Sequence, residues 1–173
     1  MLGKTIVAPA SAPGRGGISI IRMSGANAKA IAEDMCGGLA QSWKFRKCKI
    51  KSTDGLVLDS GLVVFFESPH SYTGEDVVEF HCHGNPTIVN LIVEDVIKRG
   101  AVIAEPGEFT KTAFLNDKID LAQAESVSDL INAQSKSAVI AANSSLSGNF
   151  SSSVDLIIRG LVSTRVMIEA HID

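Results

Sequence analysis

The sequence has few cysteines, no long apolar run and little excess of charge of either sign. Its three cysteines, Cys36, Cys48 and Cys82, are odd in number and form no C-x-x-C pair, which favours structural thiols in a reducing compartment. No apolar run approaches the roughly eighteen residues of a membrane-spanning helix, and the opening residues lack the apolar core and cleavage site of a signal peptide. The formal net charge of −3 argues against a surface that grips nucleic acid throughout, so we expect any RNA contact to be local or made by a partner. We therefore expect a cytoplasmic protein without a membrane segment.

Two further absences concern nucleotides. The chain contains no G-x-x-x-x-G-K-[ST] phosphate loop, so we expect neither GTP binding nor GTP hydrolysis by these residues. The glycine-rich loop at Pro13–Gly17 contains Gly14-x-Gly16, but the strand-like run Ile18–Met23 follows it where a dinucleotide-binding fingerprint needs a helix. A Rossmann-type dinucleotide site is therefore not favoured.

The residues that are present predict a globular α+β fold. Hydrophobic residues make up 45% of the chain and charged residues 20%, which is typical of a globular protein. A length of 173 residues allows a genuine core in one domain or in a domain with a helical extension. Strand-like and helix-like hydrophobic periods alternate, and Asp54-Gly55 marks a hairpin turn. In residues 1–118 we predict a mixed sheet with strands at 5–8, 18–23, 44–51, 61–66, 77–83 and 101–104, and helices at 26–35, capped by Ser24, and at 86–99, capped by Asn85.

From residue 119 to residue 173 the sequence is typical of a helical domain. Asp120-Leu-Ala-Gln123 has the form of a capping box and predicts a helix that runs to about Ala133. No proline follows Lys136, and apolar or small residues recur at steps of three and four, at Phe150, Val154, Ile157, Leu161, Thr164 and Ile168. A seam of this kind packs against partner helices, so we expect only the first part of a helical bundle here.

The most informative stretch is Pro69–Pro86, which contains a turn, a strand and a helix start. Tyr72–Asp76 has no apolar period and is predicted to be a turn. The following strand alternates, which places Val78, Phe80 and Cys82 on the core face and Val77, Glu79, His81 and His83 on the other. That polar face has three open interpretations: a solvated face, a metal site lacking a fourth ligand, or an acceptor face for an organic ligand.

Two sets of cations also allow more than one interpretation. Arg22 shares a strand face with Ile18 and Ile20, so it is either a surface side chain or a clamp for a carboxylate or ligand. Lys47, Lys49 and Lys51 form a row on one strand face, which either contacts phosphate or, as we favour, protects an exposed sheet edge.

Several longer motifs together resemble a known family. Taken in order over almost the whole chain, they resemble the N-terminal part of the MnmE family, also called TrmE, of tRNA-modification GTPases. The motifs are Thr5-Ile-Val-Ala8, Pro13-Gly-Arg-Gly-Gly17, Ile21-Arg-Met-Ser-Gly25, Tyr72-Thr-Gly-Glu-Asp76, Gly107-Glu-Phe109 and Ala113-Phe-Leu-Asn-Asp-Lys-Ile-Asp-Leu-Ala-Gln-Ala-Glu125.

The resemblance implies a domain like the folate-binding domain of the glycine-cleavage aminomethyltransferase, which binds a tetrahydrofolate derivative in its 5-formyl or methylene form and forms a homodimer. It also implies partnership with the flavoprotein MnmG in modifying the wobble uridine of tRNA. Carried over residue by residue, the folate contacts fall on Arg22, Glu79 and Lys118. The resemblance assigns no catalytic residue and no metal ligand to this chain.

The sequence departs from the family pattern in two ways. GTP, Mg²⁺ and K⁺ belong to a GTPase domain that these residues do not contain, so we expect no GTPase activity from this chain alone. The family's C-terminal Cys-Ile-Gly-Lys tail, to which a reactive cysteine and a further folate contact are attributed, is also missing. Two other functions remain open: a stand-alone folate-dependent aminomethyltransferase-like enzyme, and a domain that serves only for interaction.

Overall fold

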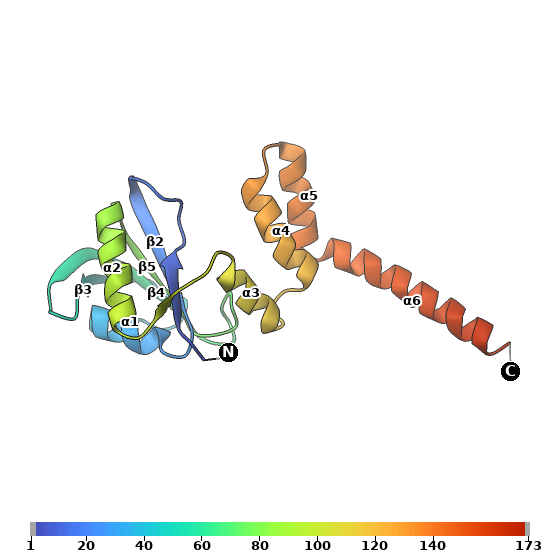
Figure 1. Ribbon diagram of the computed structural model, residues 1–173, viewed down its shortest axis with the longest axis horizontal. Coiled ribbons are helices and arrows are strands. Elements are labelled where there is room, and N and C mark those ends of the chain that lie inside the picture. Colours follow the sequence, from blue (N-terminus) through green and yellow to red (C-terminus); the bar gives the residue numbers. More distant parts are fainter. Residues whose placement is uncertain (1–2, 172–173) are drawn as a thin grey trace. The chain divides into compact units, whose positions relative to one another are not determined.

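The computed structural model describes residues 3–171, and the chain divides into two compact units, Met1–Asn116 and Asp117–Asp173 (Figure 1). The first unit is an α+β fold, and the second is helical. This confirms the predicted fold class.

A mixed sheet forms the first unit, with six strands among the described residues in the order β3-β4-β5-β2-β1-β6. The β1–β6 pair is parallel, and the other neighbouring pairs are antiparallel. The strands are β1 (Ile6–Pro9), β2 (Gly16–Ser24), β3 (Arg46–Lys51), β4 (Val57–Phe66), β5 (Val77–Gly84) and β6 (Val102–Ile103).

Helices α1 (Ala28–Cys36) and α2 (Pro86–Lys98) cover one face of this sheet (Figure 1). The core lies between the two layers, because alternate strand residues point toward the helices. Core residues of the two central strands are Ile21 and Met23 of β2 and Val78, Phe80 and Cys82 of β5, as the predicted alternation requires. The apolar stripe of α2 packs onto the same core through Val89, Ile92, Val93 and Val96.

The start of α2 is confirmed, and the predicted cap of α1 is wrong. The Asn85 side chain accepts a hydrogen bond from the Thr87 N–H at 2.9 Å, with Pro86 in the first turn. By contrast, α1 begins at Ala28 after Asn27, with no side-chain cap. Ser24 is still part of β2, and its hydroxyl bonds to side chains of the turn at 72–76 instead of to the helix.

The predicted hairpin is present as the antiparallel pair β3–β4. β4 begins at Val57, four residues before the predicted start. β3 is an outer strand of the sheet, with Lys47, Lys49 and Lys51 exposed and Cys48 and Ile50 buried. The lysine row therefore lies where it can hinder pairing with another strand.

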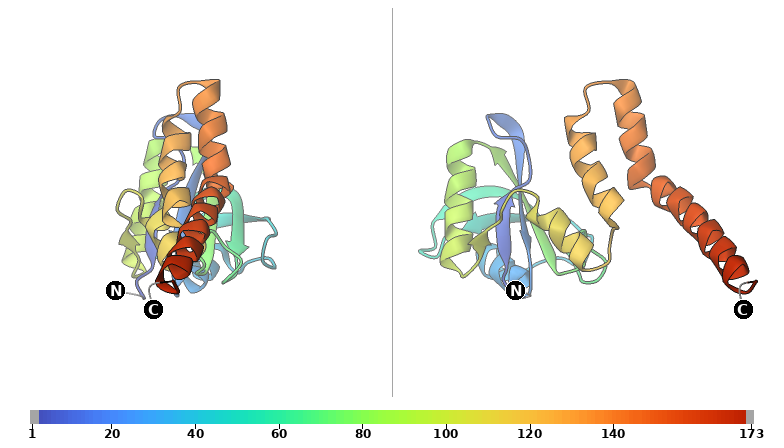
Figure 2. Two further views of the ribbon diagram at one scale, coloured as in Figure 1. Left: turned by 90° about the vertical axis from the view of Figure 1, so that its right-hand side faces the viewer. Right: turned by 45° about the vertical axis from the view of Figure 1, so that its right-hand side comes forward.

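On the opposite face of the sheet from α1 and α2 lies α3 (Glu108–Leu115), as Figure 2 shows. The turn at Tyr72–Asp76 contacts the same side, through Thr73, whose carbonyl accepts a hydrogen bond from Asn116 Nδ2 at 2.8 Å. Gly74 has φ +79°, the conformation that the predicted turn needs and that glycine adopts without steric cost. These elements cover one end of this face.

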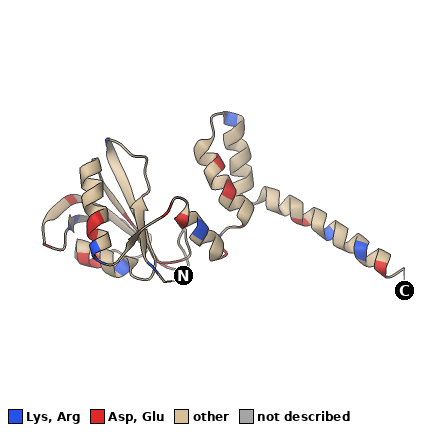
Figure 3. Ribbon diagram, viewed as in Figure 1, with Lys and Arg blue, Asp and Glu red and all other residues tan. Residues whose placement is uncertain are grey.

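The second unit contains α4 (Leu121–Asn132), α5 (Lys136–Leu146) and α6 (Asn149–Glu169). The predicted capping box is present, since the Asp120 side chain accepts from the Gln123 N–H while the Gln123 side chain accepts from the Asp120 N–H. α4 and α5 lie side by side (Figure 2), whereas α6 has no buried residue among those described and carries widely spaced charges (Figure 3). None of the helices described is both long and apolar enough to cross a membrane.

Candidate ligand-binding site

Arg22 and Glu79 form an ion pair on the face of the sheet that α1 and α2 do not cover. They are register partners on the neighbouring strands β2 and β5, so their side chains emerge side by side. Arg22 Nε and Nη2 donate to the same carboxylate oxygen, Glu79 Oε1, at 2.9 and 2.8 Å. The Glu79 side chain is 13% exposed and that of Arg22 27%, so solvent reaches both groups but surrounds neither.

The other carboxylate oxygen of Glu79 has a weaker partner. Oε2 lies 3.3 Å from His81 Nε2, at the long end of hydrogen bonding. The His81 ring is in edge contact with Phe45, with 5.2 Å between ring centroids. Glu79 Oε2 is thus the atom of the pair best placed to accept from an incoming N–H donor.

The three polar residues of β5 do not act together. His83 Nδ1 lies 2.7 Å from Asp59 Oδ1, and the His83 backbone N–H donates to Asp59 Oδ2, so this imidazole is bound to β4. His81 contacts Glu79 instead. In the part of the chain that the structure describes, no three His, Cys, Asp or Glu side chains gather as a metal-ion ligand group.

Two aromatic rings approach the guanidinium of Arg22. The carbon Cζ lies 5.3 Å from the Tyr72 ring centroid and 5.7 Å from that of Phe109, within the range of cation–π attraction. Tyr72 comes from the turn before β5 and Phe109 from α3, and the Tyr72 hydroxyl is 2.8 Å from Thr110 Oγ1. Segments distant in sequence therefore bring two aromatic rings to the Arg22 side of the ion pair.

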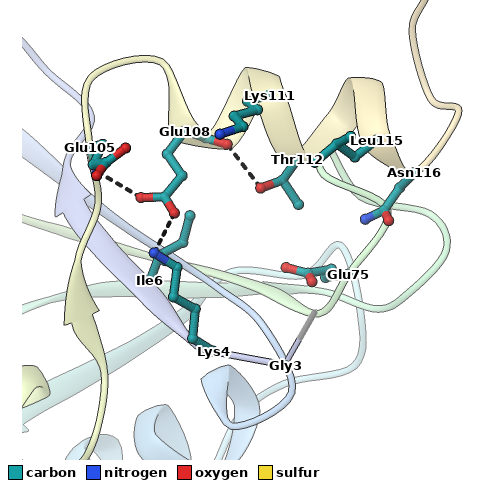
Figure 4. A pocket seen from close by; sticks show the side chains of 10 residues that line it. All are labelled: Gly3, Lys4, Ile6, Glu75, Glu105, Glu108, Lys111, Thr112, Leu115 and Asn116. Carbon is teal, nitrogen blue, oxygen red and sulfur yellow. Dashed lines mark hydrogen bonds and ion pairs between the residues drawn. The ribbon is translucent and has the colours of Figure 1, made fainter. Parts of the chain in front are cut away.

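A cavity of about 410 Å³, with charged and apolar side chains in its lining, lies beside α3 (Figure 4). Lys4 Nζ lies 2.6 Å from Glu108 Oε1, and Glu108 Oε2 accepts from the Glu105 N–H. The hydrogen bond with Glu108 raises the pKa of Lys4, and the hydrogen bond from Lys4 lowers the pKa of Glu108, so both groups stay charged at neutral pH. The lining residues are Gly3, Lys4, Ile6, Glu75, Glu105, Glu108, Lys111, Thr112, Leu115 and Asn116, which do not include Arg22 or Glu79.

Comparison with known proteins decides the family. Residues 5–118 match the family model described as "GTP-binding protein TrmE N-terminus", and residues 121–173 match the model of the "MnmE helical domain". The chain belongs to the MnmE family. Over 169 residues it is 47% identical to the tRNA modification GTPase MnmE of Neisseria meningitidis serogroup B and to that of Hydrogenovibrio crunogenus, and 46% identical to that of Nitrosomonas eutropha. Each match covers 98% of this chain but 38% of the relative, so the chain spans little more than a third of the length of these MnmE proteins.

Of the three residues that the MnmE resemblance singled out, two lie together. Arg22 and Glu79 are 57 positions apart in sequence and in direct contact. Lys118 belongs to the second unit, Asp117–Asp173. Their roles in folate binding stay predictions.

Sequence reasoning missed the charged residues of the cavity beside α3. Glu75 and Glu108 lie inside two motifs that carried the resemblance, Tyr72–Asp76 and Gly107–Phe109, so a signal for them was present. Lys4 lies next to a third motif but has no helical or strand period of its own. Only the packing of α3 against the start of β1 brings these side chains together.

Proposed function

We propose that the first unit is a tetrahydrofolate-binding, homodimerising module of a GTPase that acts with the flavoprotein MnmG on the wobble uridine of tRNA. Membership of the MnmE family supports the tRNA-modification setting. The observation that carries the folate proposal is the partly exposed Arg22–Glu79 pair with aromatic rings beside it.

The donor and acceptor atoms of this pair suit a pterin ring. Glu79 Oε2 makes only the 3.3 Å contact to His81, so it is able to accept the N–H donors of an aminopyrimidinone edge. Arg22 uses Nε and Nη2 on one oxygen, and its guanidinium has further N–H groups for a ligand carbonyl. Tyr72 and Phe109 provide flat surface at the same place. A 5-formyl or methylene tetrahydrofolate, when bound, supplies the one-carbon unit.

We assign the remaining functions by family and not by geometry. Lys118 is proposed to meet the carboxylates of the folate glutamate tail, as a lysine ammonium suits an anionic group. GTP, Mg²⁺, K⁺ and GTP hydrolysis are assigned to the portion of the MnmE relatives that lies beyond the match. The whole protein is proposed to act in the cytoplasm, and the homodimer is proposed to form through the first unit.

Substitution of Glu79 tests the folate site. Glu79→Ala is expected to weaken binding of 5-formyltetrahydrofolate, measured by titration calorimetry, by about thirty- to a thousand-fold. This corresponds to roughly 2–4 kcal/mol for a lost charge-assisted pair of hydrogen bonds. The fold is expected to survive, because Glu79 points away from the core residues Val78 and Phe80.

Lys49→Ala is the matched control. Lys49 is an exposed charged residue on the edge strand β3, so its removal is expected to change the affinity by less than about twofold. If the parent binds the folate tightly and Glu79→Ala binds it equally well, Glu79 is not part of the folate site. If the folded parent binds no folate, both folate functions are contradicted and the interaction-only function is left. Product formation from folate and an amine by this chain alone would favour the stand-alone enzyme.

A further inference from the structure

Two of the three cysteines lie next to each other in the folded chain. Cys36 is the last residue of α1 and Cys48 is in the middle of β3, yet their Sγ atoms are 3.0 Å apart. Each residue is only 7% exposed. The third thiol, Cys82, is in β5 and contacts the Ser19 carbonyl instead.

We propose that Cys36 and Cys48 are a dithiol that a low-molecular-weight disulfide, of the glutathione type, oxidises to an intrachain disulfide. A covalent S–S bond is about 2.05 Å long, so the two sulfur atoms need to approach by only about 1 Å. β3 is at the edge of the sheet and α1 ends at Cys36, so an oxidant reaches the pair by local opening at an element end.

The step balances as two successive thiol–disulfide exchanges. The Cys48 thiolate attacks one sulfur of the oxidant, forms a mixed disulfide and releases one small thiolate. The sulfur of Cys36 then attacks the Cys48 sulfur and releases the second small thiolate. The two protons from the cysteines end on the two released thiols, so the oxidant is reduced while the chain loses two hydrogens.

The local charges assign these roles. The hydrogen bond with Cys36 lowers the pKa of Cys48, and the positive charge of Arg46 acts in the same direction. Hydrogen bonding to Cys48 and burial raise the pKa of Cys36, so Cys36 keeps its proton while Cys48 is the first thiolate. Arg46 also donates to the Gly38 carbonyl, which holds the connecting segment close to both cysteines.

The new bond would constrain the segment that carries Trp43 and Phe45. Residues 37–47 would lie inside a covalent ring, and Phe45 contacts His81 beside Glu79. Oxidation is therefore expected to stiffen one wall of the candidate site. Closing a ring of this size is expected to raise the thermal midpoint of the first unit by roughly 10–15 °C.

The experiment equilibrates the folded 173-residue chain with reduced and oxidised glutathione, alkylates the remaining thiols and maps peptides by mass spectrometry without reduction. We expect a Cys36–Cys48 link, a chain lighter by two hydrogen atoms, and alkylation of Cys82 after unfolding. Cys82 is a suitable internal control, because it is also buried and burial raises its pKa to about 11. Cys82→Ala is expected to form the same link.

Other products overturn the proposal. Three unmodified thiols in the folded chain, a persistent glutathione adduct on Cys48, a link to Cys82, or a link between two chains each contradict it. Cys48→Ala is expected to show no intrachain link. If that variant does not fold, the peptide map of the parent and of Cys82→Ala still decides the question.

Discussion

At the residue scale, Asp95 is a buried carboxylate that joins three segments of the first unit. It is 2% exposed and accepts hydrogen bonds from the Thr53 N–H, the Thr53 hydroxyl and Arg99 Nε, at 2.9, 3.0 and 2.9 Å. Arg99 in turn forms an ion pair with Asp34 of α1. α1, α2 and the β3–β4 turn are therefore connected through one carboxylate.

Asp95→Ala is expected to lower the free energy of unfolding by about 3 kcal/mol. The change leaves the buried donors of Thr53 and Arg99 without their acceptor, and unpaired buried donors retain their desolvation cost. Urea denaturation monitored by circular dichroism measures the loss. Glu94→Ala is the control. Glu94 directly precedes Asp95 in α2 but is exposed, so this change is expected to alter the free energy of unfolding by less than about 0.5 kcal/mol.

Asp59 gives the first unit a dependence on acid. Burial acts to raise the pKa of Asp59, but hydrogen bonds from the backbone and ring of His83 and from the Ser60 N–H outweigh it and hold this pKa below its usual value. A carboxylate with a lower pKa in the folded state stabilises the fold above about pH 4, and this contribution is lost as the pH falls through the folded-state pKa.

Asp59→Asn is therefore expected to make stability less steeply dependent on pH. Between about pH 4 and pH 2 the parent should lose more stability than the variant, because asparagine keeps an acceptor oxygen but does not titrate. Urea midpoints at several pH values measure both slopes, and the other carboxylates titrate in both chains. Parallel slopes would show that Asp59 contributes nothing to the pH dependence.

At the element scale, the close approach of β4 to its neighbour β5 depends on Gly61. A Cβ atom on Gly61 would overlap the backbone carbonyl of His81 in β5. Backbone atoms of a central strand have little freedom to move, so this position admits no side chain.

Gly61→Ala is expected to separate β4 from β5 locally and to lower the free energy of unfolding by more than about 2 kcal/mol. Gly17→Ala, in β2, is the control, because among residues 3–171 no atom beyond its own chain neighbours lies within 4 Å of the Cβ position there. Thermal unfolding of the two variants measures the difference. Equal midpoints would mean that β4 shifts without cost.

At the scale of the whole molecule, the two units differ in how much apolar surface they bury. The first unit has a continuous core between its sheet and α1 and α2. In the second unit, α6 leaves large apolar residues exposed, among them Leu156, Ile157 and Leu161. A helix of this kind has little tertiary packing to stabilise it.

Amides of α6 are therefore expected to exchange hydrogen for deuterium at least about a hundredfold faster than those of β5. Exchange followed by mass spectrometry at low protein concentration measures both segments in one sample. Protection of α6 equal to that of β5 would contradict its exposure. If such protection rose with concentration, a second copy of the chain would account for it.

Several features of the fold were predictable from short stretches of sequence. The alternation over residues 77–83, the lysine face of β3, the cap at Asn85 and the capping box at Asp120 all agree with the structure. The cap expected at Ser24 was wrong, because its hydroxyl bonds to Thr73 and Glu75, which lie far along the chain. Local rules hold where the competing partners are also local.

The sequence by itself determined the periods, caps and turns, because each depends on a few neighbouring residues and on backbone geometry. It also pointed to Arg22 and Glu79 separately. Only the tertiary structure decided that β2 and β5 are neighbours in a register that pairs these two side chains, and that α1 and β3 bring Cys36 to Cys48. Strand order and register arise from burying all the apolar faces at once, so contacts between distant residues depend on the whole first unit.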